Sequence, residues 1–269
     1  PLMLRARKKL GQHFLHDPAV IDRLVSTIAP EPKDTMVEIG SGRGALTQPL
    51  LETLEAIHVI ELDVRLAEHL IKLVPEPQRL IMHRGDALKM DFSSLAPASG
   101  SLRIVGNLPY NISTPVLFHL LRHRAVIEDM HFMFQKEVAT RITATPGRKE
   151  YGRLTVMLAP WVDAQTCFDV GPGAFSPPPK VWSTVIRLTP QTEARFYIKN
   201  QERFSALVAR TFSMRRKTIA RSLSGWLSRE QISASDIDPG ERPEQLRPED
   251  FAKLANLESC DWTGNTKPP

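Results

Sequence analysis

The chain has 269 residues, 42% of them hydrophobic and 24% charged, which is the balance of a folded globular protein and excludes a disordered one. This length suits one large domain, or a medium domain with a smaller one. Lys and Arg outnumber Asp and Glu by 35 to 30, an excess that permits a polyanionic partner without requiring one. The two cysteines, Cys167 and Cys260, lie far apart with no ligand residues nearby, so we expect neither a disulfide framework nor a metal site.

No stretch of the sequence is apolar for the length that a membrane span needs. The basic residues 1–15 also lack the apolar segment of a signal peptide. Because two thiols without partners suit a reducing compartment, we expect a cytoplasmic protein.

Helix and strand patterns alternate over the first half of the chain. Asp17-Pro18 is typical of a helix start, and an apolar face at helical spacing follows as far as Pro30. Strands are expected at 36–39, 57–60, 80–82, 102–105 and 130–134, with helices at 45–54, 66–71 and 115–121 between them. Alternation at this interval predicts an α/β fold of the Rossmann-like, doubly wound type with a mostly parallel sheet.

The pattern changes after Tyr151. Residues 154–158 and 181–188 are predicted as two late strands, joined by a proline-rich loop, that extend the sheet antiparallel at one edge. A polar connector at 189–200 follows, and beyond it the apolar residues from Phe204 to Leu223 indicate one long helix. We therefore expect two domains, residues 1–190 and a small all-α C-terminal domain at 191–269.

A glycine-rich turn, Gly40-Ser41-Gly42-Arg43-Gly44, joins the first strand of the sheet to its helix. Glycines let the backbone turn sharply and approach a ligand closely. Glu61 ends the next strand, where a carboxylate can accept hydrogen bonds from two ribose hydroxyls. The spacing fits a dinucleotide as well as an adenosyl ligand. A purely structural turn is disfavoured because the glycines and the acidic residue occur together.

The tetrapeptide Asn107-Leu108-Pro109-Tyr110 follows the fourth strand, at the edge where open α/β sheets bind ligands. The amino nitrogen of adenine is a poor nucleophile because its lone pair is delocalised into the ring. The Asn107 side chain and a backbone carbonyl can accept both of its N–H groups, and Tyr110 offers a flat face for an extracted base. A simple turn is the competing interpretation, which the position after strand four disfavours. Asp86, after Gly85, could accept from an adenine amino group, although Gly-Asp is also common in turns.

In this order, the motifs resemble the ribosomal RNA adenine N6,N6-dimethyltransferase family, which includes small-subunit enzymes and their antibiotic-resistance relatives. Besides Glu61, the resemblance rests on residues 8–15, 37–47, 85–86, 107–113, 135–137, 151–154, 175–181 and 215–218. It implies that S-adenosyl-L-methionine is the cofactor. It also implies dimethylation of two adjacent adenines in a 3′-terminal hairpin of small-subunit ribosomal RNA, within a ribosomal subunit precursor. The resemblance to the small-subunit enzymes further implies a role in ribosome biogenesis, and we expect the chain to act as a monomer.

The resemblance also assigns residues to two sites. It implies a cofactor pocket lined by His13, Leu15, Gly40, Ser41, Gly42, Gly44, Glu61, Asp86, Ala87 and Asn107. Asn107, the Leu108 carbonyl, Pro109 and Tyr110 would handle the target base, with Phe175 as a second aromatic or, equally, as a core residue. His13 and Ser41 replace the commonest family residues, Asn and Pro, and the change at His13 has little effect if its contact is through the backbone.

Basic residues of the C-terminal domain are candidates for RNA docking: Arg210, Arg215, Arg216, Lys217 and Arg221. A solvated helix face is the competing interpretation of such a run. Docking is favoured because this domain shows no chemistry of its own and is attached to one that needs a very large substrate.

Three other functions compete with RNA methylation. An NAD-dependent oxidoreductase explains the glycine turn but leaves the Asn107–Tyr110 segment without a role. A non-catalytic ribosome-assembly or nucleic-acid-binding factor predicts a decayed pocket, whereas Glu61, Asp86 and Asn107 are all present. A methyltransferase with another acceptor, DNA adenine or a protein glutamine amide, shares the pocket. DNA enzymes more often have Asp at the first position of the tetrapeptide, which favours RNA.

Overall fold

The computed structural model describes residues 6–7 and 11–257. Lys8, Lys9 and Leu10 of the first motif, and Cys260, lie outside the described residues. The chain forms two compact units, one of Pro1–Ala139 with Asp163–Pro190 and one of Thr140–Val162 with Gln191–Pro269. No helix in the described part of the chain is long and apolar enough to cross a membrane.

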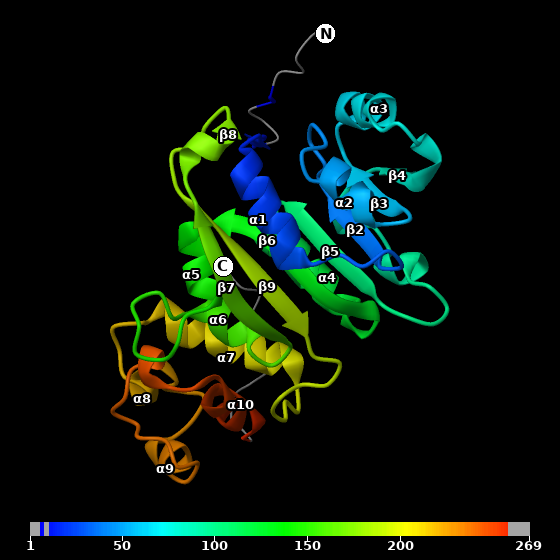
Figure 1. Cartoon of the computed structure of the whole chain (residues 1–269). Helices are drawn as coiled ribbons and strands as arrows, with labels where there is room; N and C mark the ends of the chain where they lie inside the picture. Colours follow the sequence, from blue (N-terminus) through cyan, green and yellow to red (C-terminus); the bar gives the residue numbers. More distant parts are fainter. Residues whose placement is uncertain (1–5, 8–10, 258–269) are drawn as a thin grey trace. The chain divides into compact units, whose positions relative to one another are not determined.

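The first unit is built on a seven-stranded sheet with the strand order β4-β3-β2-β5-β6-β9-β7 (Figure 1). In that order the strands are Leu80–Arg84, Ile57–Glu61, Thr35–Ile39, Leu102–Asn107, Ile127–Gln135, Ser183–Pro190 and Val162–Val170. Strands β2 to β6 are parallel, and β9 runs antiparallel to β6. The predicted fold class, a mostly parallel α/β sheet with an antiparallel edge, is therefore confirmed.

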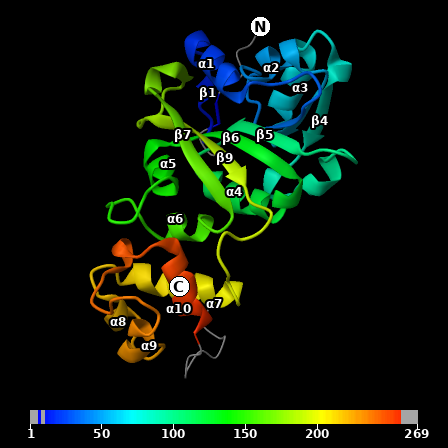
Figure 2. The same cartoon turned by 60° about the horizontal axis from the view of Figure 1, so that its bottom comes forward.

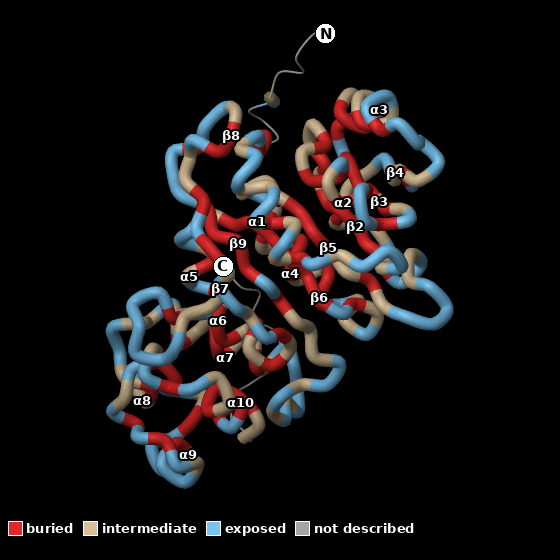
Figure 3. Tube along the Cα trace, in the orientation of Figure 1, coloured by how far each residue is buried: buried red, intermediate tan, exposed pale blue. Residues whose placement is uncertain are grey.

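Helices cover both faces of this sheet. They are α1 Pro18–Ile28, α2 Thr47–Thr53, α3 Val64–Leu73, α4 Ser113–Arg122 and α5 Lys136–Ile142. Buried leucines of α1, α2 and α3 share one apolar cluster with Met36, Val59 and Val105 of the strands. Helix α4 lies on the opposite face (Figure 2). The sheet is consequently buried on both sides, as the continuous run of buried residues along its central strands shows (Figure 3).

The expected start of α1 is confirmed in detail. The Asp17 carboxylate accepts the backbone N–H groups of Ala19 and Val20 at 2.9 and 3.3 Å, which satisfies donors that a helix N-terminus leaves open. Just before α1, the short strand β1 (Phe14–Leu15) pairs antiparallel with β8 (Phe175–Ser176). This pairing holds residues 13–15 beside the main sheet.

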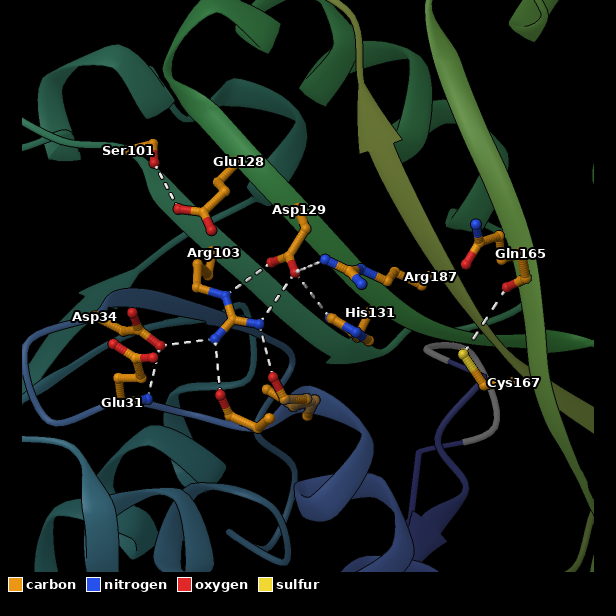
Figure 4. A network of polar contacts seen from close by, with 12 residues as sticks. Glu31, Asp34, Ser101, Arg103, Glu128, Asp129, His131, Gln165, Cys167 and Arg187 are labelled. Atoms are coloured by element: carbon orange, nitrogen blue, oxygen red, sulfur yellow. Dashed lines mark hydrogen bonds and ion pairs between the residues drawn. The ribbon is translucent and has the colours of Figure 1, made fainter.

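A buried ionic network closes the amino-terminal edge of the sheet, opposite the ends at which α/β sheets bind ligands (Figure 4). The Arg103 guanidinium binds Asp129 through two hydrogen bonds of 2.9 and 3.0 Å and Asp34 through one of 2.7 Å. It also donates to the Ile28 carbonyl at 2.6 Å. Because one guanidinium joins β5, β6, α1 and the start of β2, the network fixes these elements relative to one another.

The strand predicted at 154–158 is wrong, because these residues form helix α6 (Arg153–Leu158). The edge strand is instead β7, which is rich in polar residues and alternates too weakly between buried and exposed positions to be recognised. Residues 140–162, expected in the first domain, belong to the second unit. Tyr151 attaches this segment to the second unit. It is fully buried in that unit's core, and its hydroxyl donates to the Leu246 carbonyl at 2.8 Å.

The second unit is helical, as expected for residues after 191. Besides α6 it contains α7 Gln201–Ser213, α8 Ile219–Ser222, α9 Arg229–Ser233 and α10 Pro248–Asn256. The single long helix predicted from Phe204 to Leu223 is wrong, since the chain leaves the helix at Met214 and re-enters it after Thr218, whose side chain caps α8. The apolar spacing continues across this break because Ile219 and Leu223 enter the same core as Phe204.

Candidate active site

A pocket lies at the carboxyl ends of four neighbouring parallel strands of the first unit, β4, β3, β2 and β5. Open α/β sheets bind ligands at this edge. Twelve of the residues assigned from the sequence line it: His13, Leu15, Gly40, Ser41, Gly42, Glu61, Asp86, Ala87, Asn107, Leu108, Pro109 and Tyr110. Residues as far apart in the chain as His13 and Tyr110 are thus brought together here.

The glycine turn after β2 requires its glycines for two different reasons. Gly40 and Gly42 adopt φ of 75° and 57°, in the left-handed region that side chains disfavour. At Gly42 a Cβ would also lie 3.0 Å from the Phe14 ring. Gly44 does not line the pocket, and a Cβ there would meet Leu70 of α3 at 2.6 Å. Gly44 therefore allows α3 to pack closely against the turn. We expected Gly44 in the cofactor pocket, but the structure places it outside the pocket lining.

Glu61 at the end of β3 is the acidic partner of this turn. Its carboxylate accepts the backbone N–H of Asp63 at 3.0 Å, that of Gly42 at 3.2 Å and the Ser41 hydroxyl at 3.3 Å. Burial raises the pKa of Glu61, while the three hydrogen bonds oppose this rise. A carboxylate has about four acceptor positions, so these three bonds leave one of them open. A second opens for a ligand hydroxyl when the Ser41 hydroxyl gives up its bond, the longest of the three.

Asp86 lies where β4 ends. One of its oxygens caps the short 3-10 helix Ala87–Lys89 by accepting the Leu88 N–H at 3.0 Å. This bond fixes the carboxylate at the pocket wall, with strands β3 and β2 between it and the Asn107 segment. The turn interpretation and the ligand interpretation of Gly85-Asp86 are therefore compatible, because the same side chain caps a turn and faces the pocket.

Asn107 ends β5, and the structure determines how its amide is oriented. The Nδ2 group donates to the His13 carbonyl at 3.0 Å. The Oδ1 atom of the same amide is consequently the acceptor that remains for a ligand. His13 thus contacts Asn107 through its backbone carbonyl, and this contact does not depend on the departure from the family's usual Asn.

Tyr110 has its ring fixed at both ends. Its hydroxyl forms a 3.1 Å hydrogen bond with the Ser183 hydroxyl, and its ring stacks on His13 with centroids 5.6 Å apart. The His13 ring is itself held by the Pro177 carbonyl, 2.8 Å from Nδ1. Partial burial raises the pKa of the Tyr110 phenol, so it stays neutral. A fixed, neutral ring at the pocket mouth is suited to stacking on a base.

Two further residues of the pocket escaped the sequence analysis as individual candidates. Phe14 of β1 covers Gly42, and the Arg43 guanidinium lies 4.5 Å from the centroid of its ring. Glu38 is buried on the floor of the pocket and accepts a short hydrogen bond from Thr47. Burial raises the Glu38 pKa from an ordinary 4.5 to about 7. The sequence did contain a signal for Glu38, because a carboxyl inside an otherwise apolar predicted strand is unusual.

Phe175 does not line the pocket. It is 2% exposed, pairs with Leu15 across the β1–β8 ribbon and packs in the main apolar cluster. The core interpretation of Phe175 is therefore the one that the structure supports. Its contribution to the site is indirect, because the ribbon that it anchors carries His13 and Leu15.

The basic residues proposed for RNA docking divide into two kinds within the second unit. Arg210 donates to the Ser222 and Ser224 carbonyls at 2.8 and 2.9 Å, and Arg215 donates to the Lys149 and Tyr151 carbonyls at 2.6 and 2.9 Å. These two arginines hold their own unit together. Arg216, Lys217 and Arg221 are exposed.

The sheet topology, the glycine turn facing an acidic strand end, and the Asn107–Tyr110 segment at the next strand define a Rossmann-like methyltransferase. Comparison with known proteins narrows this class. A family model described as ribosomal RNA adenine dimethylase matches residues 3–259, so the chain belongs to that family. The resemblance stated from the sequence motifs is thereby confirmed.

Curated relatives and solved structures agree with this family. The chain is 50% identical over 252 residues to "Ribosomal RNA small subunit methyltransferase A" of Acinetobacter baylyi, covering 94% of this chain and 92% of the relative. It is 49% identical over 253 residues to the protein of the same name from Alcanivorax borkumensis, with 94% and 90% covered. Both relatives match along nearly their whole length.

Two crystal structures share the fold at 27% sequence identity. A dimethyladenosine transferase from Plasmodium falciparum superposes with a TM-score of 0.73, covering 90% of this chain and 96% of that one. The 23S rRNA methyltransferase ErmE superposes with a TM-score of 0.70, covering 90% and 98%. The similarity therefore extends over both compact units and not only over the sheet.

Proposed function

We propose that this protein transfers methyl groups from S-adenosylmethionine to the N6 amino groups of adenine in small-subunit ribosomal RNA. The observation that carries the proposal is the Asn107 amide, whose nitrogen is held by His13 so that its oxygen remains to accept from the target amine. The family and the curated relatives supply the class of substrate.

The pocket residues fit S-adenosylmethionine by their chemistry. Glu61 has one open acceptor position and a second that the Ser41 hydroxyl gives up to a ligand, which suits the two ribose hydroxyls, and Asp86 has an oxygen for the exocyclic amine of the cofactor's adenine. The bends at Gly40 and Gly42 let the backbone come close to the methionine part. When bound there, the cofactor supplies an electrophilic methyl group on a sulfonium.

The chain's own contribution is positioning. Asn107 Oδ1 and the Leu108 carbonyl accept the two N–H groups of the target amine, which favours a tetrahedral nitrogen whose lone pair points at the methyl group. Pro109 fixes the loop so that the Leu108 carbonyl before it faces the site, and Tyr110 holds the plane of the extracted base. Because the proton leaves after the nitrogen becomes cationic, no strong base is needed. Holding two reactants in line accounts for most of the rate.

We further propose the finer substrate, two adjacent adenines in a 3′-terminal hairpin of the small-subunit RNA, methylated within a subunit precursor in the cytoplasm by a monomeric enzyme. Support for it comes from the relatives' name, which specifies the small subunit. Docking of this RNA on the second unit through Arg216, Lys217 and Arg221 is part of the same proposal, since these three cations are exposed.

The proposal is tested by supplying radiolabelled S-adenosylmethionine with purified small or large ribosomal subunits from cells that lack this modification. Label is expected in the RNA of the small subunit and in adenine only. Incorporation into large-subunit RNA would instead indicate a 23S rRNA methyltransferase, as ErmE is named. Incorporation into neither, with the cofactor bound, would contradict the proposed substrate.

A further inference from the structure

An exposed tryptophan, Trp182, has no role in the proposed chemistry. Trp182 is 53% exposed and follows Val181, which is 44% exposed, at the end of the proline-rich loop. An exposed tryptophan beside a second exposed apolar side chain is a candidate contact site, because covering apolar surface removes it from water. Trp182 belongs to the first unit, as the Tyr110 pocket does.

Two neighbours, Gly171 and Lys136, hold the indole in place. Its six-membered ring lies against Gly171, 3.7 to 3.8 Å from where a Cβ on that glycine would be. Lys136 lies beside it, with Nζ 5.9 Å from the ring centroid, and the Lys136 backbone N–H donates to the Trp182 carbonyl at 2.9 Å. Asp169 fixes this ammonium group at 2.6 Å. The result is a supported aromatic surface with a Lys136–Asp169 ion pair beside it.

The position of Trp182 relative to the reacting groups is set by the next residue. Ser183 begins β9, and its hydroxyl is the 3.1 Å partner of the Tyr110 hydroxyl. Trp182 therefore lies at the same carboxyl edge of the sheet as Asn107 and Tyr110. In the strand order β4-β3-β2-β5-β6-β9-β7, the cofactor residues occupy the β4 to β2 side and Trp182 the opposite side.

The reaction relates the position of the substrate to that of the cofactor. In a displacement the attacking nitrogen must approach the methyl group opposite the departing sulfur. Under the proposed function Glu61 and Asp86 hold the cofactor on the β2 to β4 side, so we expect an adenine held by Asn107 and Tyr110, with its neighbouring nucleotides, on the side of β6 and β9. An adenine taken out of its RNA stack leaves its neighbours unstacked as well, and these need a new surface.

We propose that Trp182 is a stacking platform for a nucleotide adjacent to the target adenine, with Lys136 and the exposed Lys180 contacting the RNA backbone at its rim. The proposal rests on the proposed function, because it concerns the RNA bound at that active site. Stacking on an aromatic side chain tolerates any base, so the platform positions the RNA without reading its sequence.

The test uses the full chain, S-adenosylmethionine and a fluorescently labelled RNA hairpin carrying two adjacent adenines in its loop. Trp182→Ala is expected to weaken RNA binding roughly tenfold, and Trp182→Phe by much less, because phenylalanine keeps a π-face. S-adenosylmethionine affinity and thermal unfolding should be unchanged in both. Tyr197→Ala, which removes an aromatic that is 74% exposed in the second unit, serves as the matched control and should bind as the wild type does.

Abasic substitutions in the RNA identify the stacked nucleotide. Removing the base next to the target adenine should weaken binding by the wild type but have no further effect on Trp182→Ala, since the same contact is then already lost. Additive losses, or a Trp182→Ala variant that binds and methylates the RNA like the wild type, would overturn the platform. Failure of the wild type itself to methylate small ribosomal subunits would count against the proposed function instead.

Discussion

The role of Glu61 in cofactor binding gives a prediction with a magnitude. Hydrogen bonds to a charged carboxylate contribute about 1.5–3 kcal/mol each, and about 1.4 kcal/mol corresponds to a factor of ten in affinity. If Glu61 accepts the ribose hydroxyls, Glu61→Ala should weaken S-adenosylmethionine binding at least tenfold in calorimetry. The contact is made equally by the product, so S-adenosylhomocysteine should lose affinity to a similar extent.

The structure also shows what must be controlled. Glu61 accepts from Gly42 and Asp63, so its removal frees two backbone donors as well as the ribose. Ser41→Ala removes only the longest of the three bonds, 3.3 Å, and should change cofactor affinity less than threefold (about 0.6 kcal/mol). A cofactor analogue without ribose hydroxyls should bind the wild type and Glu61→Ala equally. Unchanged binding of the intact cofactor by a folded Glu61→Ala protein would place the pocket elsewhere.

Three further predictions concern catalysis, docking and stability. Asn107→Ala should abolish methyl transfer while RNA binding stays nearly intact, and wild-type single-turnover rates at saturating cofactor would remove Asn107 from the mechanism. Changing Arg216, Lys217 and Arg221 together to Glu should weaken RNA binding and make it less dependent on salt. The log–log slope of affinity against salt concentration should become shallower by roughly 0.7 to 0.9 for each phosphate contact that is lost. An unchanged slope would mean that RNA docks elsewhere. Burial raises the pKa of Glu38 from 4.5 to about 7. Between these two pH values the folded state keeps a proton that the unfolded state has released, so the stability of the protein falls as pH rises from 4.5 to about 7. Glu38→Gln should therefore gain about 3 kcal/mol relative to the wild type between pH 4 and pH 8 in denaturant titrations, and a constant difference would show that Glu38 ionises normally.

Much of the catalytic unit could be predicted because its signals are local. Buried parallel strands appear as apolar runs, and a glycine turn followed by an acidic strand end depends on spacing alone. These signals located Gly40, Glu61 and Asn107 in one pocket. The sequence could not show that Asn107 is oriented by the His13 carbonyl, since this contact joins residues 94 positions apart.

The errors arose where periodicity is ambiguous or interrupted. Residues 154–158 are apolar enough for a strand or a helix, and the structure shows them as a helix whose Val156 packs in the same core as Tyr151. The Arg210 and Arg215 side chains looked like free cations because the carbonyls that they bind come from other turns of the chain. The triple substitution proposed for docking accordingly leaves these two arginines in place, because their loss would disturb the fold itself.

The most direct test of the central claim is mass-spectrometric mapping of methylated adenines in the small-subunit RNA. The RNA would be taken from cells lacking their own dimethylase and supplied with this chain or with its Asn107→Ala variant. We expect N6,N6-dimethyladenosine at two adjacent adenines of the 3′-terminal hairpin with the wild type, and unmodified adenines there with the variant. Methylation at other positions, or equal dimethylation by the two proteins, would contradict the account.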